Sequence, residues 1–226
     1  MRLVTLCLLC LAACGRPLSE GEARLMSEVM GPTLEGSQVR FVEAGVIGMT
    51  SRTYPVRPRT TCREKIAPPP DGPTFESRTA GAVLFDHVLT NPDWTLPDYL
   101  PDYPQAMNLP AAMFLAHEMT HVWQWQNRGT TGYHPLRGAA EHRGGDDPYL
   151  FDPEDRTPFL ALGYEQQAAL VEEYVCCRTL DPGGARTRRI WERLRAVMPV
   201  APPGQAPRPI AVSGIHTDTV IEGICG

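Results

Sequence analysis

The spacing of apolar residues predicts four helices in this chain. Ser19 and Glu22 form a capping-box pattern ahead of the first helix, and Gly31 closes it. Asn108 is the expected N-cap of the second helix, with Pro110 in its first turn. The four predicted helices cover residues 20–30, 109–127, 157–180 and 187–198.

Short apolar runs bounded by Gly, Pro and polar residues predict strands between these helices. The strongest candidate spans residues 79–90, and two weaker ones lie at residues 39–42 and 46–49. The tail over residues 210–225 is expected to hold one or two more strands. Stretches rich in Pro, Gly or polar residues are predicted to be irregular, and they cover residues 52–73, 91–104, 128–158 and 202–209.

Length and composition limit the number of domains and the classes of protein to which the chain can belong. With 226 residues, the chain is expected to form one domain, or one domain with appendages. A composition of 42% hydrophobic and 21% charged residues is typical of a globular protein. The net charge of −5 argues against a nucleic-acid binder, because phosphate binding needs a basic face.

The first fourteen residues are expected to lie outside the fold. A basic start precedes an apolar run, residues 3–11, that is too short to span a bilayer. The run ends in Leu11, two alanines and Cys14, which resembles a bacterial lipoprotein signal whose cysteine becomes the lipidated N-terminus. This predicts a signal peptide over residues 1–13, a tether over residues 14–19, and a lipid-anchored protein of the bacterial cell envelope that faces the periplasm. The alternative is an ordinary signal peptide with an incidental cysteine.

Four cysteines remain beyond the signal: Cys62, Cys176, Cys177 and Cys225. An even number of cysteines in an exported chain favours disulfides. A bridge between the adjacent Cys176 and Cys177 would be strained, so the other two are each expected to pair with one of them. Which one each takes stays open, and four buried free thiols are the alternative.

The segment H-E-M-T-H, residues 117–121, lies inside the second predicted helix. Residues four apart share a helix face, so His117 and His121 can bind one metal ion. Glu118 then lies beside the metal and can act as the base toward a metal-bound water. The motif therefore predicts a metal centre, with zinc as the expected ion.

A catalytic zinc normally has three protein ligands, so a third ligand is needed. The metzincin arrangement is excluded, because Gln124 and Asn127 occupy the positions of its glycine and third histidine. Glu165, near the start of the third predicted helix, is the expected ligand, because a buried carboxylate is costly unless it is paired or metal-bound. The alternatives are His134, His142, Asp146 and Glu172, of which the two loop histidines are otherwise expected to be exposed to solvent.

Several motifs are similar to those of a known family. They are H-E-M-T-H-V-W-Q at residues 117–124, D-P-Y-L at residues 147–150, and Y-E-Q-Q-A at residues 164–168. The start of the chain, up to residue 41, is similar as well. Over roughly residues 18–180 the chain resembles bacterial zincin-like proteins that are described as Vgr-related, or as the zincin-like domain of contractile-injection proteins.

This resemblance implies a compact α+β fold of the zincin-like metalloprotease kind over residues 20–183. Residues 184–226 would form a C-terminal helix, a Pro-rich linker and a short strand tail packed on that domain. The implied site residues are His117, His121 and Glu165 as metal ligands and Glu118 as the base.

One position departs from the thermolysin-like pattern. Ala169 stands where an aspartate often orients a ligand histidine, and Glu172, one turn further, can take that role. Side chains in or beside the loop that follows the metal helix can stabilise an oxyanion or support a ligand. These candidates are Tyr133, Arg137, His142, Tyr149 and Tyr164.

The combined prediction is an exported, lipid-anchored zinc peptidase. Zinc would lower the pKa of a bound water, Glu118 would take its proton, and hydroxide would attack a peptide carbonyl. The strand at residues 82–89 would line the cleft and pair with a peptide substrate. The expected partners are this peptide or protein substrate and the membrane, reached through Cys14, and no nucleic acid. The alternatives are a non-catalytic, zinc-stabilised envelope module that binds another protein, and a small-molecule or cell-wall hydrolase.

Overall fold

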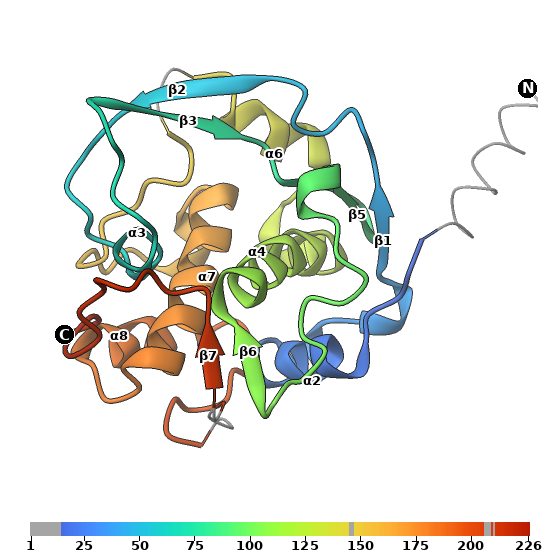
Figure 1. The fold of residues 1–226 in the computed structure, drawn as a ribbon. Coiled ribbons are helices and arrows are strands. Elements are labelled where there is room, and N and C mark those ends of the chain that lie inside the picture. Colours follow the sequence, from blue (N-terminus) through green and yellow to red (C-terminus); the bar gives the residue numbers. More distant parts are fainter. Residues whose placement is uncertain (1–14, 145–146, 206–208, 210) are drawn as a thin grey trace, which may run out of the picture.

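The computed structural model describes residues 15–144, 147–205, 209 and 211–226. The predicted signal peptide and the lipidation site Cys14 lie outside the described residues. Figure 1 shows helices α4 (Leu109–Gln126) and α7 (Tyr164–Leu180) in the middle of the molecule, surrounded by small sheets and shorter helices. The fold is mixed α+β, as the sequence predicts. Within the described part of the chain, no helix is long and apolar enough to cross a membrane.

The remaining elements are short. The α-helices are α2 (Glu20–Val29), α3 (Cys62–Ile66), α5 (Arg128–Thr131), α6 (Pro135–Glu141) and α8 (Ala185–Leu194). The 3-10 turns are η1 (Gly31–Thr33), η2 (Gly36–Gln38), η3 (Pro92–Trp94) and η4 (Phe159–Ala161). The strands are β1 (Arg40–Glu43), β2 (Ser51–Pro55), β3 (Thr74–Arg78), β4 (Gly81–Leu84), β5 (His87–Thr90), β6 (Ala106–Asn108) and β7 (Ala211–Ser213).

The largest sheet of the described residues has the strand order β1-β5-β4. Strand β5 lies parallel to β1 and antiparallel to β4, so that Val88 is opposite both Phe41 and Val83. These apolar side chains are buried and belong to the main core. Strand β4 is therefore an edge of this sheet, with one row of backbone hydrogen-bonding groups outside the pairing.

Two further strand pairs complete the framework. Strands β2 and β3 form an antiparallel ribbon, with Thr53 opposite Glu76. Strand β7 pairs in parallel with β6, which leads directly into α4. The C-terminal tail is thereby joined to the start of the central helix.

Helix α4 is buried almost all round, from Leu109 through residues 111–124. A helix that is apolar on every side needs neighbours on every side, and α7 is its principal one. Small side chains at Ala116 on α4 and at Ala168 and Ala169 on α7 are buried, and they let the two helices approach closely. This packing brings the middle of α4 against the beginning of α7.

Two disulfides tie the periphery to α7. Cys62 of α3 is bonded to Cys176, and Cys177 is bonded to Cys225 of the tail. The prediction that Cys62 and Cys225 each pair with one of the adjacent cysteines is confirmed, and the structure decides which pairs with which. The four cysteines of these bridges are buried in the core.

The four predicted helices are present, but the fourth ends at Leu194 and not at residue 198, and the third has a shifted start. The third begins at Tyr164 and not near residue 157, because residues 159–161 form a 3-10 turn and Gly163 is the N-cap of α7. The N-caps Ser19 and Asn108 accept hydrogen bonds from Glu22 N and Ala111 N, at 3.2 and 3.1 Å.

Several strand and loop predictions are wrong. Residues 79–90 form two strands and not one, because Phe85 adopts a φ of 61° and the chain reverses there. Residues 46–49 form turns and no strand, and Gly48 has a φ of 76°. The stretches 52–73 and 128–158 are not irregular throughout, since they contain β2, α3, α5 and α6.

Candidate metal centre

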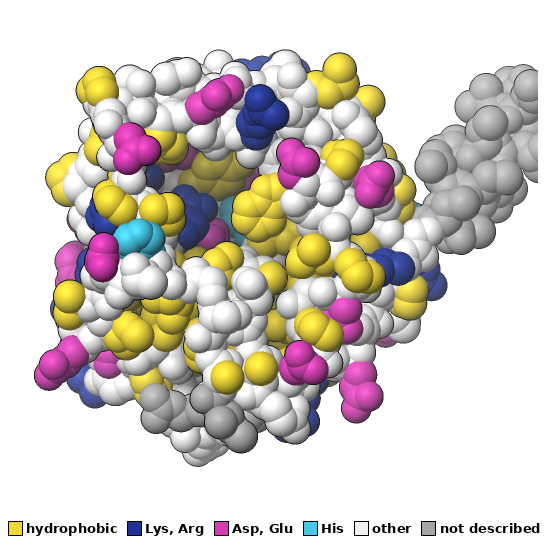
Figure 2. All heavy atoms as spheres, viewed as in Figure 1, with side chains coloured by type: hydrophobic (Ala, Val, Ile, Leu, Met, Phe, Trp, Pro, Cys, Tyr) yellow, Lys and Arg dark blue, Asp and Glu magenta, His cyan; other side chains and the backbone are white. Residues whose placement is uncertain are grey.

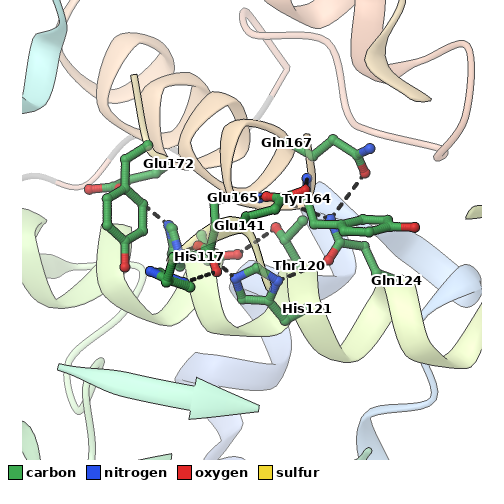
Figure 3. A network of polar contacts seen from close by, with 12 residues as sticks. His117, Thr120, His121, Gln124, Glu141, Tyr164, Glu165, Gln167 and Glu172 are labelled. Carbon is green, nitrogen blue, oxygen red and sulfur yellow. Dashed lines mark hydrogen bonds and ion pairs between the residues drawn. The ribbon is translucent and has the colours of Figure 1, made fainter. Parts of the chain in front are cut away.

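Three potential ligand atoms converge between α4 and α7. The Nε2 atoms of His117 and His121 each lie 3.2 Å from Oε2 of Glu165. In Figure 3 the three side chains point toward one another, the histidines from α4 and the glutamate from α7. All three residues are buried. The expected ligand set from the sequence is therefore brought together at one point.

Local helix geometry explains this convergence. The Asn108 cap and Pro110 start α4, which then runs without interruption past His121, so that His117 and His121 lie one turn apart on the face toward α7. Glu165 lies in the first turn of α7, where the helix dipole favours a carboxylate. The third ligand therefore sits at a helix terminus that stabilises its charge.

Side-chain amides fix the ring of His121. Its Nδ1 lies 2.9 Å from Oε1 of Gln124. The Gln124 amide is itself oriented, because its Nε2 donates to Tyr164 O at 3.1 Å and to Gln167 Oε1 at 3.0 Å. Oε1 must then accept from His121 Nδ1, which leaves Nε2 as the nitrogen free to bind a metal.

A carboxylate fixes the ring of His117. Its Nδ1 lies 3.3 Å from Oε2 of Glu172, the residue that the sequence suggests as a substitute for an aspartate at position 169. Arg63 of α3 lies on the other side, with its NH1 also 3.3 Å from that oxygen. Sequence reasoning missed Arg63, Gln124 and Gln167 as supporting residues. Only Gln124 carried a local signal, because it follows His121 by three residues on the same helix face.

Glu118 lies beside the three ligand atoms without joining them. Its side chain is buried, and its Oε2 has no hydrogen-bond partner among the described residues. The edge strand β4 passes directly against it, since a Cβ added at Gly81 would lie 2.6 Å from Cδ of Glu118. A buried acceptor that lacks a protein partner is available to a water or a substrate group.

The other candidates lie at different distances from the centre. His142 contacts Glu165 Oε1 at 2.8 Å, and the ring of Tyr149 lies 5.6 Å from that of His117. The ring of Tyr133 stacks 6.0 Å from that of His121. The remaining side chains make contacts elsewhere: Tyr164 and Arg137 donate to the Gly132 carbonyl, and Nδ1 of His134 accepts from Leu136 N. Asp146 lies outside the described residues.

The electrostatics of the cluster fit a divalent cation. Burial raises the pKa of Glu165, but His121 and His117 more than offset this and hold it well below its usual range. Burial lowers the pKa of His117, but hydrogen bonds to Glu165 and Glu172 raise it to about 10. Burial also raises the pKa of Glu118. Three buried carboxylates thus face two imidazoles, and a bound cation would replace the protons that this cluster otherwise holds.

A second group of metal-capable side chains does not form a metal site. Cys62, Cys177 and Cys225 lie close together, but each is in a disulfide. A disulfide sulfur carries no thiolate charge for a metal ion. Two imidazoles and one carboxylate are thus the candidate metal ligands, a set that is typical of zinc.

Comparison with known proteins gives a likeness in fold. No protein-family model matches the chain, and no curated protein matches it in sequence. Among solved structures, the chain is similar to the effector domain of VgrG2b from Pseudomonas aeruginosa, with a TM-score of 0.50 and 21% sequence identity. The match covers 82% of this chain and 85% of that chain. The chain therefore shares its α+β architecture with a Vgr-related effector domain.

Proposed function

We propose that the chain is a metal-dependent hydrolase of the zincin type, and specifically a zinc peptidase. The observation that carries this proposal is the convergence of His117, His121 and Glu165 beside the buried carboxylate of Glu118. Structural zinc sites use four protein ligands, whereas catalytic sites use three and keep one position open. The cluster in the described residues supplies three.

Each residue around the site would have a separate task. Zinc held by His117, His121 and Glu165 would supply Lewis-acid activation of a water molecule and of the substrate carbonyl. Glu118 would accept the proton of that water and pass it to the leaving amine. Gln124 and Glu172 would hold the two imidazoles in the orientation that presents Nε2 to the ion.

The edge strand β4 supports a peptide as substrate. Gly81, the first residue of β4, lies against Glu118, so the unpaired edge of this strand begins next to the proposed base. An extended peptide can pair with such an edge through its backbone. Figure 2 shows a hollow in the face of the molecule below the β2–β3 ribbon, with acidic, basic and histidine side chains visible within it. A polypeptide bound along β4 would thus place a carbonyl near the metal ligands.

The location of the protein is part of the same proposal. The segment from Leu11 to Cys14 and the fold shared with an effector domain both support an exported protein. We expect Cys14 to carry lipid and to anchor the chain in the cell envelope, because several acyl chains give stable membrane binding. The test is membrane fractionation, and a Cys14→Ser chain that is still processed and still membrane-bound would contradict the anchor.

The decisive experiment compares peptide hydrolysis by the wild type and Glu118→Gln at equal zinc content. The variant removes the base but none of the three ligands, so zinc should be retained while hydrolysis falls at least 10²–10⁴-fold, the usual effect of a positioned acid–base group. Glu20→Gln, an exposed position on α2, removes the same charge away from the site and should leave the rate unchanged. Absence of hydrolysis in the zinc-loaded wild type across a broad peptide library would favour the non-catalytic binding module.

A further inference from the structure

The C-terminal end of α6 contacts the first turn of α7, where the third candidate ligand lies. Glu141 is the last residue of α6. Its Oε1 accepts a hydrogen bond from Tyr164 N at 2.9 Å, and its Oε2 accepts one from Glu165 N at 3.0 Å. The carboxylate of Glu141 therefore holds the backbone of Glu165 directly, and Figure 3 shows the two residues side by side.

The next residue, His142, holds the side chain of the same ligand. Its Nε2 lies 2.8 Å from Oε1 of Glu165. A carboxylate can only accept, so the histidine nitrogen is the donor. Oε1 is thereby engaged by His142, while Oε2 faces the Nε2 atoms of His117 and His121.

The start of α7 needs such support from another element. The first N–H groups of a helix lack partners within the helix, and a Ser, Thr, Asp or Asn N-cap usually satisfies one of them. The N-cap here is Gly163, which has no side chain to accept a hydrogen bond. Glu141 supplies both acceptors from α6, at the two residues that begin the helix.

We infer that Glu141 and His142 are a positioning pair for the third metal ligand, in which Glu141 fixes the backbone of Glu165 and His142 directs its Oε2 toward the two histidines. This inference rests on the proposed metal site. His142 acts through Glu165 and not as a ligand, because its ring nitrogens are outside the convergent set that the described residues form. The pair thus completes the site from the C-terminal end of α6, a segment separate from helix α4, which carries the two histidine ligands.

The test is the affinity of the metal-stripped full chain for Zn²⁺, measured by competition with a chromophoric chelator. His142→Ala should bind zinc about 10–100-fold more weakly, the usual effect of losing a partner that orients a ligand. His142→Gln keeps an N–H donor and should bind nearly as the wild type does. His216→Ala, in the C-terminal tail, is the matched control and should leave the affinity unchanged. The metal-free His142→Ala chain should still unfold cooperatively, at a lower temperature than the wild type, because the buried Glu165 carboxylate loses one hydrogen-bond partner.

The backbone half of the pair is tested separately. Glu141→Ala removes both acceptors and should weaken zinc binding, whereas Glu141→Gln keeps one acceptor and should weaken it less. If Glu141→Ala does not fold, Glu141→Gln still tests this half of the inference, because its zinc affinity should lie between those of the wild type and Glu165→Ala. An affinity of Glu141→Gln equal to that of the wild type would overturn this half of the inference.

A second comparison separates this inference from the metal site itself. In a Glu165→Ala background, His142→Ala should have no further effect on zinc affinity, because the residue on which it acts is gone. An additional loss in that background would mean that His142 binds zinc directly, which overturns the inference. Weak binding by Glu165→Ala with wild-type binding by His142→Ala would also overturn it while leaving the site intact. Wild-type binding by Glu165→Ala would instead refute Glu165 as the third ligand.

Discussion

The contact between β4 and the proposed base gives a sharp test of the site's packing. A Cβ at Gly81 would lie 2.6 Å from both Cδ and Oε1 of Glu118. Ordinary contact begins near 3.4 Å, so Gly81→Ala requires one side to move by about 0.8 Å. The backbone of β4 is held by its pairing with β5, so the movement falls on the Glu118 carboxylate, which is buried in the site.

The expected energies follow from this overlap. Overpacking of this kind costs about 1–3 kcal/mol. Alanine in place of glycine in a strand stabilises the fold by roughly 0.5–1 kcal/mol when there is room for it. In a Glu118→Ala background the carboxylate is absent, so Gly81→Ala should become stabilising. The two substitutions should therefore couple by about 1–3 kcal/mol, well above the roughly 0.5 kcal/mol within which independent sites add.

The measurement is urea unfolding of the wild type, the two single variants and the double variant. All four should be stripped of metal with a chelator, so that metal affinity does not enter the free energy of unfolding. Gly72→Ala is the matched control, because a Cβ there meets no atom within 4 Å, and it should add independently of Glu118→Ala. Additive effects of Gly81→Ala and Glu118→Ala would refute the argument that β4 restrains the Glu118 carboxylate.

In an activity assay, Gly81→Ala should retain zinc yet lose roughly 10²-fold in rate, as for a misplacement of about 1 Å.

Further predictions concern the metal, the disulfides and one carboxylate. Chelation of the metal should lower the unfolding temperature, and zinc at 100 times its Kd should restore about 2.7 kcal/mol; a variant that lacks either candidate histidine ligand should not respond. Removal of the Cys177–Cys225 bridge, with a sequence separation of 48, should lower the free energy of unfolding by about 4 kcal/mol. Removal of Cys62–Cys176, with a separation of 114, should lower it by about 5 kcal/mol. Urea unfolding of the paired serine variants measures both, and a larger loss for the shorter loop would contradict the chain-entropy account. Burial raises the pKa of Glu64, but backbone N–H groups that donate to its carboxylate lower the pKa below 4.5 overall. The ionised carboxylate therefore stabilises the fold above pH 4.5, and this stabilisation is lost as the pH falls through the folded-state pKa. Glu64→Gln should therefore be less stable by about 1 kcal/mol near neutral pH, and a difference that persists in thermal unfolding at low pH would count against this assignment.

The sequence determined those features whose signals lie within a few residues of one another. The N-caps at Ser19 and Asn108 and the two histidines four residues apart are local patterns, and each is present as expected. Glu165 could be selected because a carboxylate at the start of a helix that packs in the core is costly to bury without a partner. The helices and the proposed ligand set therefore needed no knowledge of the fold.

Tertiary structure decided the features that depend on segments far apart in the chain. The break of residues 79–90 into β4 and β5 lies at Phe85, whose φ of 61° is uncommon for an aromatic residue and whose ring packs 4.6 Å from that of Trp125 on α4, so no local pattern marked it. The choice between Cys176 and Cys177 depends on which side of α7 faces α3, since the two residues are adjacent and chemically identical. A one-residue difference on a helix rotates a side chain by about 100°, which only packing can resolve.

The support of the proposed ligands also came from the tertiary structure. Arg63 reaches Glu172 across 109 positions in the sequence, and Glu141 and His142 reach Glu165 from a stretch predicted to be irregular. Such contacts are made by polar side chains whose types are common on any surface, so their identity carries no signal before the elements are packed. The sequence named the residues that would hold a metal because their chemistry is local, and the packing of α3, α6 and α7 fixed their orientations because hydrogen bonds act only over about 3 Å.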